Sequence, residues 1–114
     1  MNYFSPEELT CRCGCGLNIV SGKLVVLMNR VREKFGEPII VTSGSRCKKH
    51  NKKVGGSATS SHLDGLAMDC RMPLPAGKRH KLVELLFRFQ RIGLSKEFFH
   101  VDIDPAKKQA LWFY

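Results

Sequence analysis

Apolar residues recur every three or four positions in two stretches of the chain, which is the spacing of an amphipathic helix. The first stretch holds Val20, Leu24, Leu27, Met28, Val31 and Phe35. Ser21 is a candidate N-cap for this helix, and Gly36 is a candidate stop. The second stretch follows the turn-forming segment PLPAG and holds Leu82, Val83, Leu85, Leu86 and Phe89. It predicts a helix that ends near Gly93.

Four shorter runs are apolar and rich in β-branched or aromatic residues, which favours strands. They are PIIVTS (38–43), GLAMDCRM (65–72), EFFHVDID (97–104) and QALWFY (109–114). Between the first two lie SRCKKHNKKV, which indicates a short basic helix, and the small-residue loop GGSATSS. This order predicts an α+β fold in which a small antiparallel sheet carries helices on one face.

The length and composition are those of one globular domain. The chain has 114 residues, of which 43% are apolar and 25% are charged, so we expect a single monomeric domain over residues 1–114. No apolar run approaches the roughly 20 residues that span a bilayer, and MNYFSPEEL lacks the basic start and apolar centre of a signal peptide. We therefore expect a chain that is made in the cytoplasm and has no membrane partner.

The charge of the chain indicates an anionic partner. Nineteen Lys and Arg residues against ten Asp and Glu residues give a formal charge of +9. Such a surface attracts nucleic acid, anionic lipid or anionic cell-wall polymer. The basic run RCKKHNKK is not interleaved with aromatic residues that could stack on bases. We therefore interpret this run as a solvated helix face and expect no nucleic-acid partner.

Three of the five cysteines, Cys11, Cys13 and Cys15, alternate in the segment CRCGCG. An odd number of cysteines excludes a full disulfide framework, and without a secretion signal we expect reduced thiols. One interpretation is that these thiols pack in a turn-rich segment. The other is a second metal site completed by Cys47 or a histidine, although CxCxC lacks the CxxC spacing of structural zinc knuckles.

Two polar residues occupy strand positions where apolar residues are the norm: Asp69 in GLAMDC and His100 in FFHVD. His62 lies in the serine-rich loop just before the first of these strands. A buried carboxylate must be paired, hydrogen-bonded or bound to a metal. Two imidazoles and one carboxylate leave the fourth position of zinc open, as in catalytic sites. Ion pairs with the arginines are the alternative explanation for these polar residues.

Three ordered blocks of the sequence, SGSRCKKHN, VGGSATSSHLDGLAMD and FFHVD, carry a family resemblance. They resemble the zinc D-alanyl-D-alanine carboxypeptidases and the related phage and bacterial L,D-endopeptidases of the cell wall. The family pattern HxxGxAxD is matched at His62, Gly65, Ala67 and Asp69. The resemblance extends to CRCGCG and to the RIG segment, so it covers nearly the whole chain.

The resemblance implies a role for several residues. It implies that His62, Asp69 and His100 bind zinc at the sheet, and that Arg46 in the SGxR block holds the carboxylate or carbonyl oxygen of the substrate. A guanidinium is a rigid fork of donors suited to that task, although a structural salt bridge is the alternative role of Arg46. Ser61 is a candidate hydrogen-bonding partner of the substrate.

Two acidic residues are candidates for the general base. Some branches of the family place an acidic residue three positions before the last zinc histidine, where this chain has Glu97. Asp102 is the rival, because strand alternation places it on the same face as His100. Asp102 could equally orient a histidine that binds the metal.

These residues predict a zinc metallopeptidase that hydrolyses amide bonds in peptidoglycan stem peptides, of the D-Ala-D-Ala carboxypeptidase or L,D-endopeptidase type, with a phage lysin as one such enzyme. The positive charge would concentrate such an enzyme on an anionic cell wall, and we expect it to act in the periplasm or at the wall. The alternative is a zinc-stabilised module of the same fold that binds the wall without hydrolysis.

Overall fold

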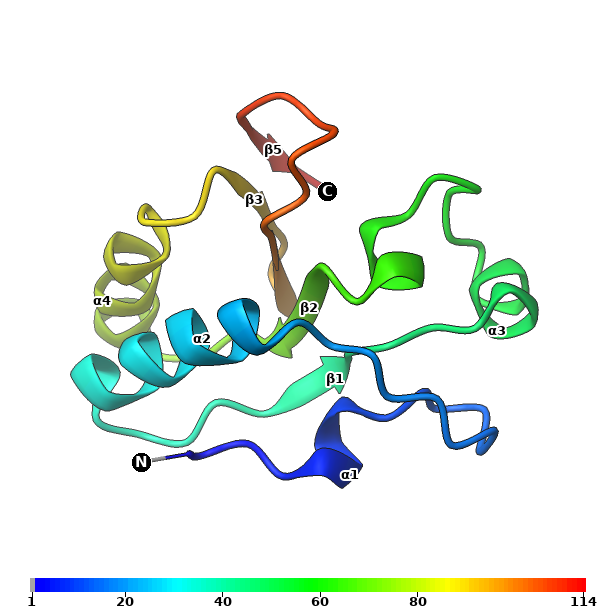
Figure 1. Cartoon of the computed structure of the whole chain (residues 1–114). Coiled ribbons are helices and arrows are strands. Elements are labelled where there is room, and N and C mark those ends of the chain that lie inside the picture. Colours follow the sequence, from blue (N-terminus) through cyan, green and yellow to red (C-terminus); the bar gives the residue numbers. More distant parts are fainter. Residues whose placement is uncertain (1) are drawn as a thin grey trace.

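A computed structural model describes residues 2–114 of the chain, which form a five-stranded sheet with helices packed against it (Figure 1). The helices are α1 (Pro6–Leu9), α2 (Gly22–Phe35), α3 (Lys48–Lys53) and α4 (Ala76–Leu86), and a short 3-10 helix, η1, covers Ser61–Asp64. The strands are β1 (Val41–Ser43), β2 (Ala67–Arg71), β3 (Arg91–Leu94), β4 (Phe98–Asp102) and β5 (Ala110–Phe113). The predicted α+β class is confirmed.

The strands lie in the order β1-β2-β4-β3-β5, and all neighbouring pairs except one are antiparallel. The exception is the β3–β5 pair, which is parallel, so the sheet is mixed where the sequence predicted an antiparallel one. The reason is the path of residues 103–109, which carry the chain from the end of β4 past the start of β3 to the outer edge of the sheet. Strand β5 then runs antiparallel to β4 and therefore parallel to β3.

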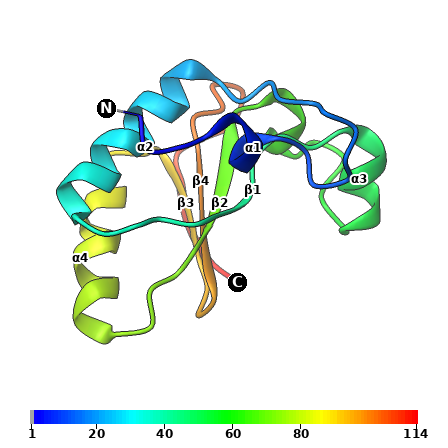
Figure 2. The same ribbon diagram turned by 90° about the horizontal axis from the view of Figure 1, so that it is seen from below.

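Helices α2 and α4 cover one face of the sheet and bury the core there. In Figure 2 the strands are seen edge-on, with α2 and α4 together on one side and α3 on the other. The core side chains of these two helices and of β2 and β4 are Leu24, Met28, Val31, Phe35, Leu82, Leu86, Met68, Cys70, Phe99 and Val101. Each buried aliphatic or aromatic side chain contributes about 1.5–3 kcal/mol. The alternate positions of the same strands, among them Asp69 and His100, face the opposite side and are free to form a site.

The ends of α2 follow the sequence signals in part. Gly36 adopts the left-handed conformation at the C-cap, with φ of 80°, and its N–H bonds to the carbonyl of Arg32. Ser21 occupies the N-cap position, but its side chain makes no capping hydrogen bond. Instead its backbone N–H donates to the carbonyl of Gly65 at 2.8 Å, which ties the start of α2 to the turn after η1.

Two elements differ from the sequence prediction. The second amphipathic helix ends at Leu86 and not near Gly93, because Arg91–Leu94 forms β3. The four residues of β3 are too few to show the alternation of a strand in the sequence. Because they directly follow a helical pattern, the prediction extended the helix over them. The second difference is α1, a single helical turn that was not predicted from the sequence. Its capping box, in which Ser5 and Glu8 exchange side-chain and backbone hydrogen bonds, is a signal that was present in the sequence.

Within residues 2–114, no helix combines the length and the apolar character needed to cross a membrane.

Candidate metal centre

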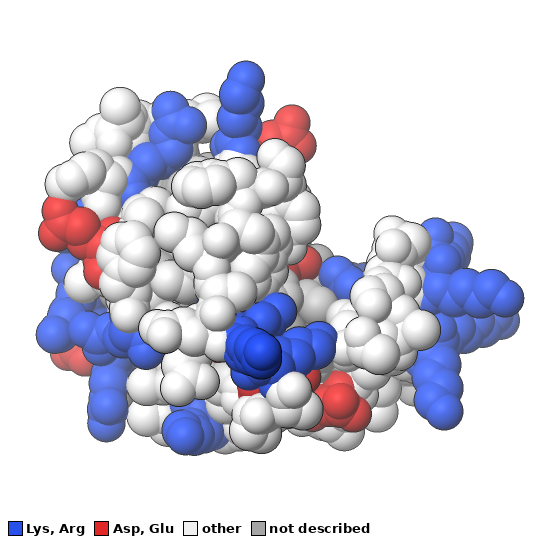
Figure 3. Space-filling model, turned by 90° about the horizontal axis from the view of Figure 1, so that it is seen from above, with Lys and Arg blue, Asp and Glu red and all other residues white. Residues whose placement is uncertain are grey.

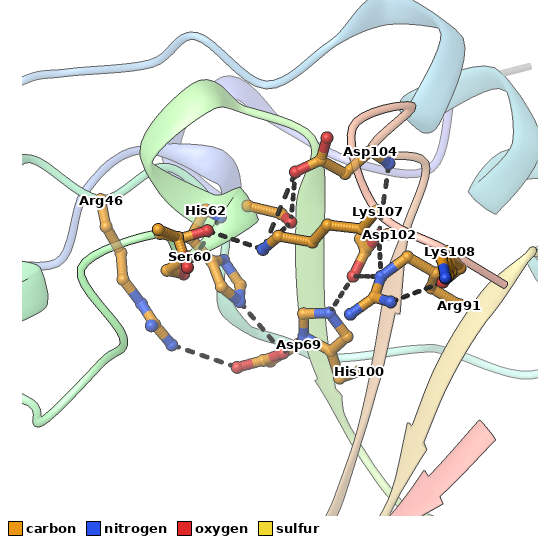
Figure 4. A network of polar contacts seen from close by, with 12 residues as sticks. Arg46, Ser60, His62, Asp69, Arg91, His100, Asp102, Asp104, Lys107 and Lys108 are labelled. Atoms are coloured by element: carbon orange, nitrogen blue, oxygen red, sulfur yellow. Dashed lines mark hydrogen bonds and ion pairs between the residues drawn. The ribbon is translucent and has the colours of Figure 1, made fainter. Parts of the chain in front are cut away.

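Three of the predicted site residues converge on the face of the sheet that the helices leave open. Ring nitrogens of His62 and His100 and a carboxylate oxygen of Asp69 all lie within 4.8 Å of one another. We call these three residues the His/Asp centre. Figure 4 shows the three side chains pointing toward one another, His62 from η1 and the other two from neighbouring strands.

The position of His62 is determined by η1 and by the backbone around it. Gly65 closes this turn in the left-handed conformation, with φ of 69°, and a Cβ there would lie 2.0 Å from the carbonyl oxygen of Ile19. The ring is buried, and Nδ1 lies 2.8 Å from the carbonyl oxygen of Gly44. A carbonyl can only accept, so Nδ1 carries the proton and Nε2 presents a lone pair. This Nε2 is buried and has no hydrogen-bond partner among the described residues.

Asp69 and His100 are brought together by strand register. They are directly paired between β2 and β4, and Nδ1 of His100 donates to Oδ1 of Asp69 at 2.8 Å. The same oxygen lies 3.2 Å from Nε2 of His62. Burial alone would raise the pKa of Asp69, but the hydrogen bond and charge of His100 outweigh it and hold this pKa well below its usual range. Asp69 is therefore ionised and available as a ligand.

Asp102 lies on the far side of the His100 ring. Its Oδ2 accepts a hydrogen bond from Nε2 of His100 at 2.7 Å, and Arg91 and the backbone N–H of Asp104 also donate to this buried carboxylate. Burial lowers the pKa of His100, but the hydrogen bonds to Asp102 and Asp69 outweigh that effect and raise it. The contact fixes the ring and leaves Nδ1 directed at the centre, an arrangement typical of metal-binding histidines.

Arg46 lies beside the centre, in the loop between β1 and α3. Its guanidinium donates to Oδ2 of Asp69 at 3.2 Å, to Ser43 and to Asn51. Its backbone N–H donates to the carbonyl of His62, so this loop and η1 are held together. The side chain is mostly buried yet borders the cleft above the centre. It can therefore present a donor to an anionic or carbonyl group of a bound molecule.

Ser61 and Glu97 differ in their surroundings. The hydroxyl of Ser61 is buried, donates to Asp104 at 2.8 Å and accepts from Lys107 at 2.9 Å, so its hydrogen-bonding capacity is used within the protein. The Glu97 side chain is exposed in the turn before β4 and makes no hydrogen bond or ion pair within the described chain. It lines a small hollow that Asp69 also borders. Their predicted roles in substrate binding and proton transfer stay predictions.

Two aromatic side chains that form one wall of the cleft were not predicted from the sequence. Trp112 on β5 and Tyr114 just after it line the cleft together with His100, and the rings of Trp112 and His100 lie 5.4 Å apart. Gly93 on β3 makes room for this wall, because a Cβ there would lie 2.6 Å from the Trp112 ring. Trp112 and Tyr114 lie two positions apart in the sequence, and this spacing was the signal that could have placed both on one face of the strand.

The donor set fits a zinc ion. Ligand atoms 2.0–2.1 Å from a tetrahedral zinc lie about 3.3 Å apart, close to the 3.2 Å between His62 and Asp69. The 2.8 Å contact between His100 and Asp69 is a hydrogen bond whose proton a metal would displace. The orphaned Nε2 of His62 supports the same conclusion, because a buried lone pair without a donor requires a partner.

Comparison with known proteins supports the resemblance. No curated protein matches the chain significantly. A family model described as peptidase M15 matches residues 2–102, a range that holds the whole His/Asp centre, Arg46 and both candidate bases. Strand β5 lies outside the match. The resemblance to the zinc D-alanyl-D-alanine carboxypeptidases is thereby confirmed, and the chain belongs to the peptidase M15 family.

Proposed function

We propose that the protein is a zinc-dependent peptidase that hydrolyses an amide bond in the stem peptides of peptidoglycan. The observation that carries this proposal is the His/Asp centre, where three donors converge at the floor of an open cleft with Arg46 beside them. A buried site that only stabilised the fold would need no cleft. Membership of a zinc-dependent peptidase family supports the same function.

Within this proposal, His62, Asp69 and His100 hold the zinc. When bound, zinc polarises a carbonyl and makes water acidic enough to lose a proton near neutral pH. Arg46 binds the terminal carboxylate of a stem peptide or the carbonyl oxygen of the scissile bond, where its fixed donors stabilise developing negative charge. The aromatic wall formed by Trp112 and Tyr114 packs against the apolar part of the peptide.

The two acidic residues take different roles in this proposal. Asp102 orients His100, because both of its oxygens already accept hydrogen bonds inside the protein. Glu97 has a free carboxylate in a hollow that Asp69 also lines, and we assign it the transfer of a proton from the attacking water to the leaving amine. In apo structures the catalytic base often lies beyond hydrogen-bonding distance of the atoms it acts on and approaches them only when substrate binds. The exposed position of Glu97 is therefore compatible with this role.

The charge of the surface supports an anionic partner. Four lysine side chains cluster on the lobe formed by α3, where Figure 3 shows no acidic side chain among them. This lobe borders the cleft, because Gly55 and Gly56 directly after it line the cleft wall. We propose that it concentrates the enzyme on an anionic cell wall, in the periplasm or at the wall itself.

The test is hydrolysis of purified peptidoglycan by the zinc-loaded chain, with the released fragments identified by mass spectrometry. New amino termini or released D-alanine are expected, and their identity separates an endopeptidase from a carboxypeptidase. The His62→Ala variant is the matched control for a contaminating hydrolase. Co-sedimentation of the chain with peptidoglycan, without any cleavage by well-folded and zinc-loaded protein, would instead indicate the wall-binding module and overturn the peptidase proposal.

A further inference from the structure

Four of the five cysteines converge outside the His/Asp centre. Cys11, Cys13 and Cys15 lie in the loop after α1, and Cys47 is the N-cap residue of α3. Their sulfur atoms all lie within 4.8 Å of one another. We call this group the thiol cluster. The fifth cysteine, Cys70, is fully buried in the core on β2 and does not belong to it.

The spacing of these sulfur atoms matches a single tetrahedral metal ion. The Sγ atoms of Cys11 and Cys13 lie 3.5 Å apart, and those of Cys13 and Cys47 lie 3.7 Å apart. Four thiolates bound to zinc at about 2.3 Å would have sulfur atoms about 3.8 Å apart. A disulfide would require about 2.05 Å. The four sulfur atoms therefore surround a space of the size of one ion.

Two glycines explain how cysteines at alternate positions can converge. In an extended strand, residues two apart are separated by about 6.6 Å, and three alternate side chains could not surround one point. Here Gly14 and Gly16 have φ of 86° and 83°, a conformation that other residues rarely adopt. The loop is also closed by a hydrogen bond from the N–H of Cys11 to the carbonyl of Leu17. CRCGCG thus brings three thiols together without the CxxC spacing.

Two sulfur atoms of the thiol cluster accept hydrogen bonds from backbone N–H groups. The backbone N–H groups of Cys47 and His50 point at the sulfur atoms of Cys11 and Cys47, at 3.4 and 3.3 Å. Such amide donors stabilise negative charge on sulfur. Four thiolates around a divalent cation carry a charge of about −2, and the adjacent α3, with sequence KKHNKK, offsets it.

The two segments that carry the thiol cluster are already docked on each other. Ser45 donates from its backbone N–H to the carbonyl of Leu9, and its hydroxyl accepts from the N–H of Ile19. Gly44 allows this approach, because a Cβ there would lie 2.6 Å from the carbonyl oxygen of Leu9. These contacts bring the two segments together without a metal, and a bound ion would then fix the loop that carries three of the thiols.

We propose that Cys11, Cys13, Cys15 and Cys47 form a second, structural zinc site with four thiolate ligands. Soft sulfur ligands in tetrahedral arrangement select zinc, and a site with four protein ligands has no position open for chemistry. Because Cys47 directly follows Arg46, this zinc fixes the loop that presents the guanidinium to the cleft. The proposal is independent of the peptidase activity.

The test is the metal content of the whole chain, purified under reducing conditions without chelator and measured by elemental analysis. Two zinc ions per chain are expected in the parent. The variant Cys13→Ser/Cys15→Ser should keep one, and His62→Ala/Asp69→Asn should keep the other. Because Cys13 and Cys15 are exposed, their substitution leaves the core intact. Parent protein with the same zinc content as the cysteine variant would overturn the proposal and leave the His/Asp centre unaffected.

Cobalt substitution separates the two sites by their ligands. Thiolate ligands give cobalt(II) an intense charge-transfer absorption in the near ultraviolet, whereas imidazole and carboxylate do not. We expect this band in the parent, in His62→Ala/Asp69→Asn and in the control Cys70→Ala, and its loss in Cys13→Ser/Cys15→Ser. The parent spectrum alone tests the proposal if a variant fails to fold. Absence of the band in the parent, or a mass showing disulfides among the four thiols in freshly purified protein, would overturn it.

Discussion

The His/Asp centre and the thiol cluster position their ligands in different ways. Two proposed ligands of the His/Asp centre, Asp69 and His100, are paired residues of neighbouring strands, and the third, His62, is held by a hydrogen bond to Gly44. Three ligands of the thiol cluster lie on one short loop that carries no strand or long helix. The first centre is thus built on paired strands of the sheet and the second on an irregular loop.

This difference separates a preorganised site from one that a metal completes. Hydrogen bonds through Arg46, Asp102 and Arg91 hold the His/Asp centre in place before any ion binds, which is what catalysis requires. The thiol cluster has only a few backbone contacts, so bound metal contributes a large share of the local order. Removing ligands or metal should therefore affect function at one centre and structure at the other.

The largest expected effect is the loss of hydrolysis in His62→Ala. Without the orphaned Nε2 the His/Asp centre loses a ligand, so polarisation of the carbonyl and activation of water disappear together. Activity should fall by more than about 10⁴-fold, beyond the effect of removing a base alone. The measurement is the initial rate on purified peptidoglycan. A rate within tenfold of the parent would show that His62 is not required.

A second comparison separates the two acidic residues. Glu97→Gln should lower kcat by about 10²–10⁴-fold with zinc still bound, because it removes a proton acceptor and no ligand contact. Asp102→Asn should instead weaken zinc binding by about 10–100-fold, because it disturbs the orientation of His100. Rates at saturating zinc, together with zinc titrations, separate these outcomes. The opposite pattern would transfer the base role to Asp102.

Chelation should loosen the two regions unequally. After zinc removal, amides of residues 11–17 and 45–50 should exchange with solvent roughly 10²-fold faster or more, because a structural zinc contributes several kcal/mol. Amides of β2 and β4 should keep their protection, since the sheet and its core do not depend on metal. Hydrogen exchange followed by mass spectrometry measures both regions at once. Equal loosening of both would contradict the contrast between the two centres.

The smallest effect is expected at the aromatic wall. Trp112→Ala should lower kcat/KM by about 2–10-fold, which corresponds to the 0.5–1.5 kcal/mol of an aromatic contact. The effect should lie mainly in KM, because the indole packs beside the centre without binding metal. Leu111→Ala on the same strand, half exposed and at an alternate position, is the matched control. An equal loss in both variants would indicate a general weakening of β5.

The periodicity of the sequence predicted the two longest helices and most strands, because a long amphipathic pattern specifies both an element and its buried face. The pattern over 20–35 led to α2 with its stop at Gly36, and the alternation in GLAMDC and FFHVD placed Asp69 and His100 on one face. The sequence could also nominate His62, because its spacing from Asp69 matches a family block. Local patterns and motif spacing thus identified the three residues that we propose as zinc ligands.

Only the tertiary structure decided how distant segments meet. The parallel β5, the removal of Arg91–Leu94 from the helix and the wall formed by Trp112 depend on contacts between residues far apart in the chain. The convergence of CRCGCG with Cys47 likewise required the positive φ angles of two glycines and the docking of Leu9 on Ser45. Spacing along a sequence encodes local geometry, whereas these features depend on the register and direction with which separate segments pack.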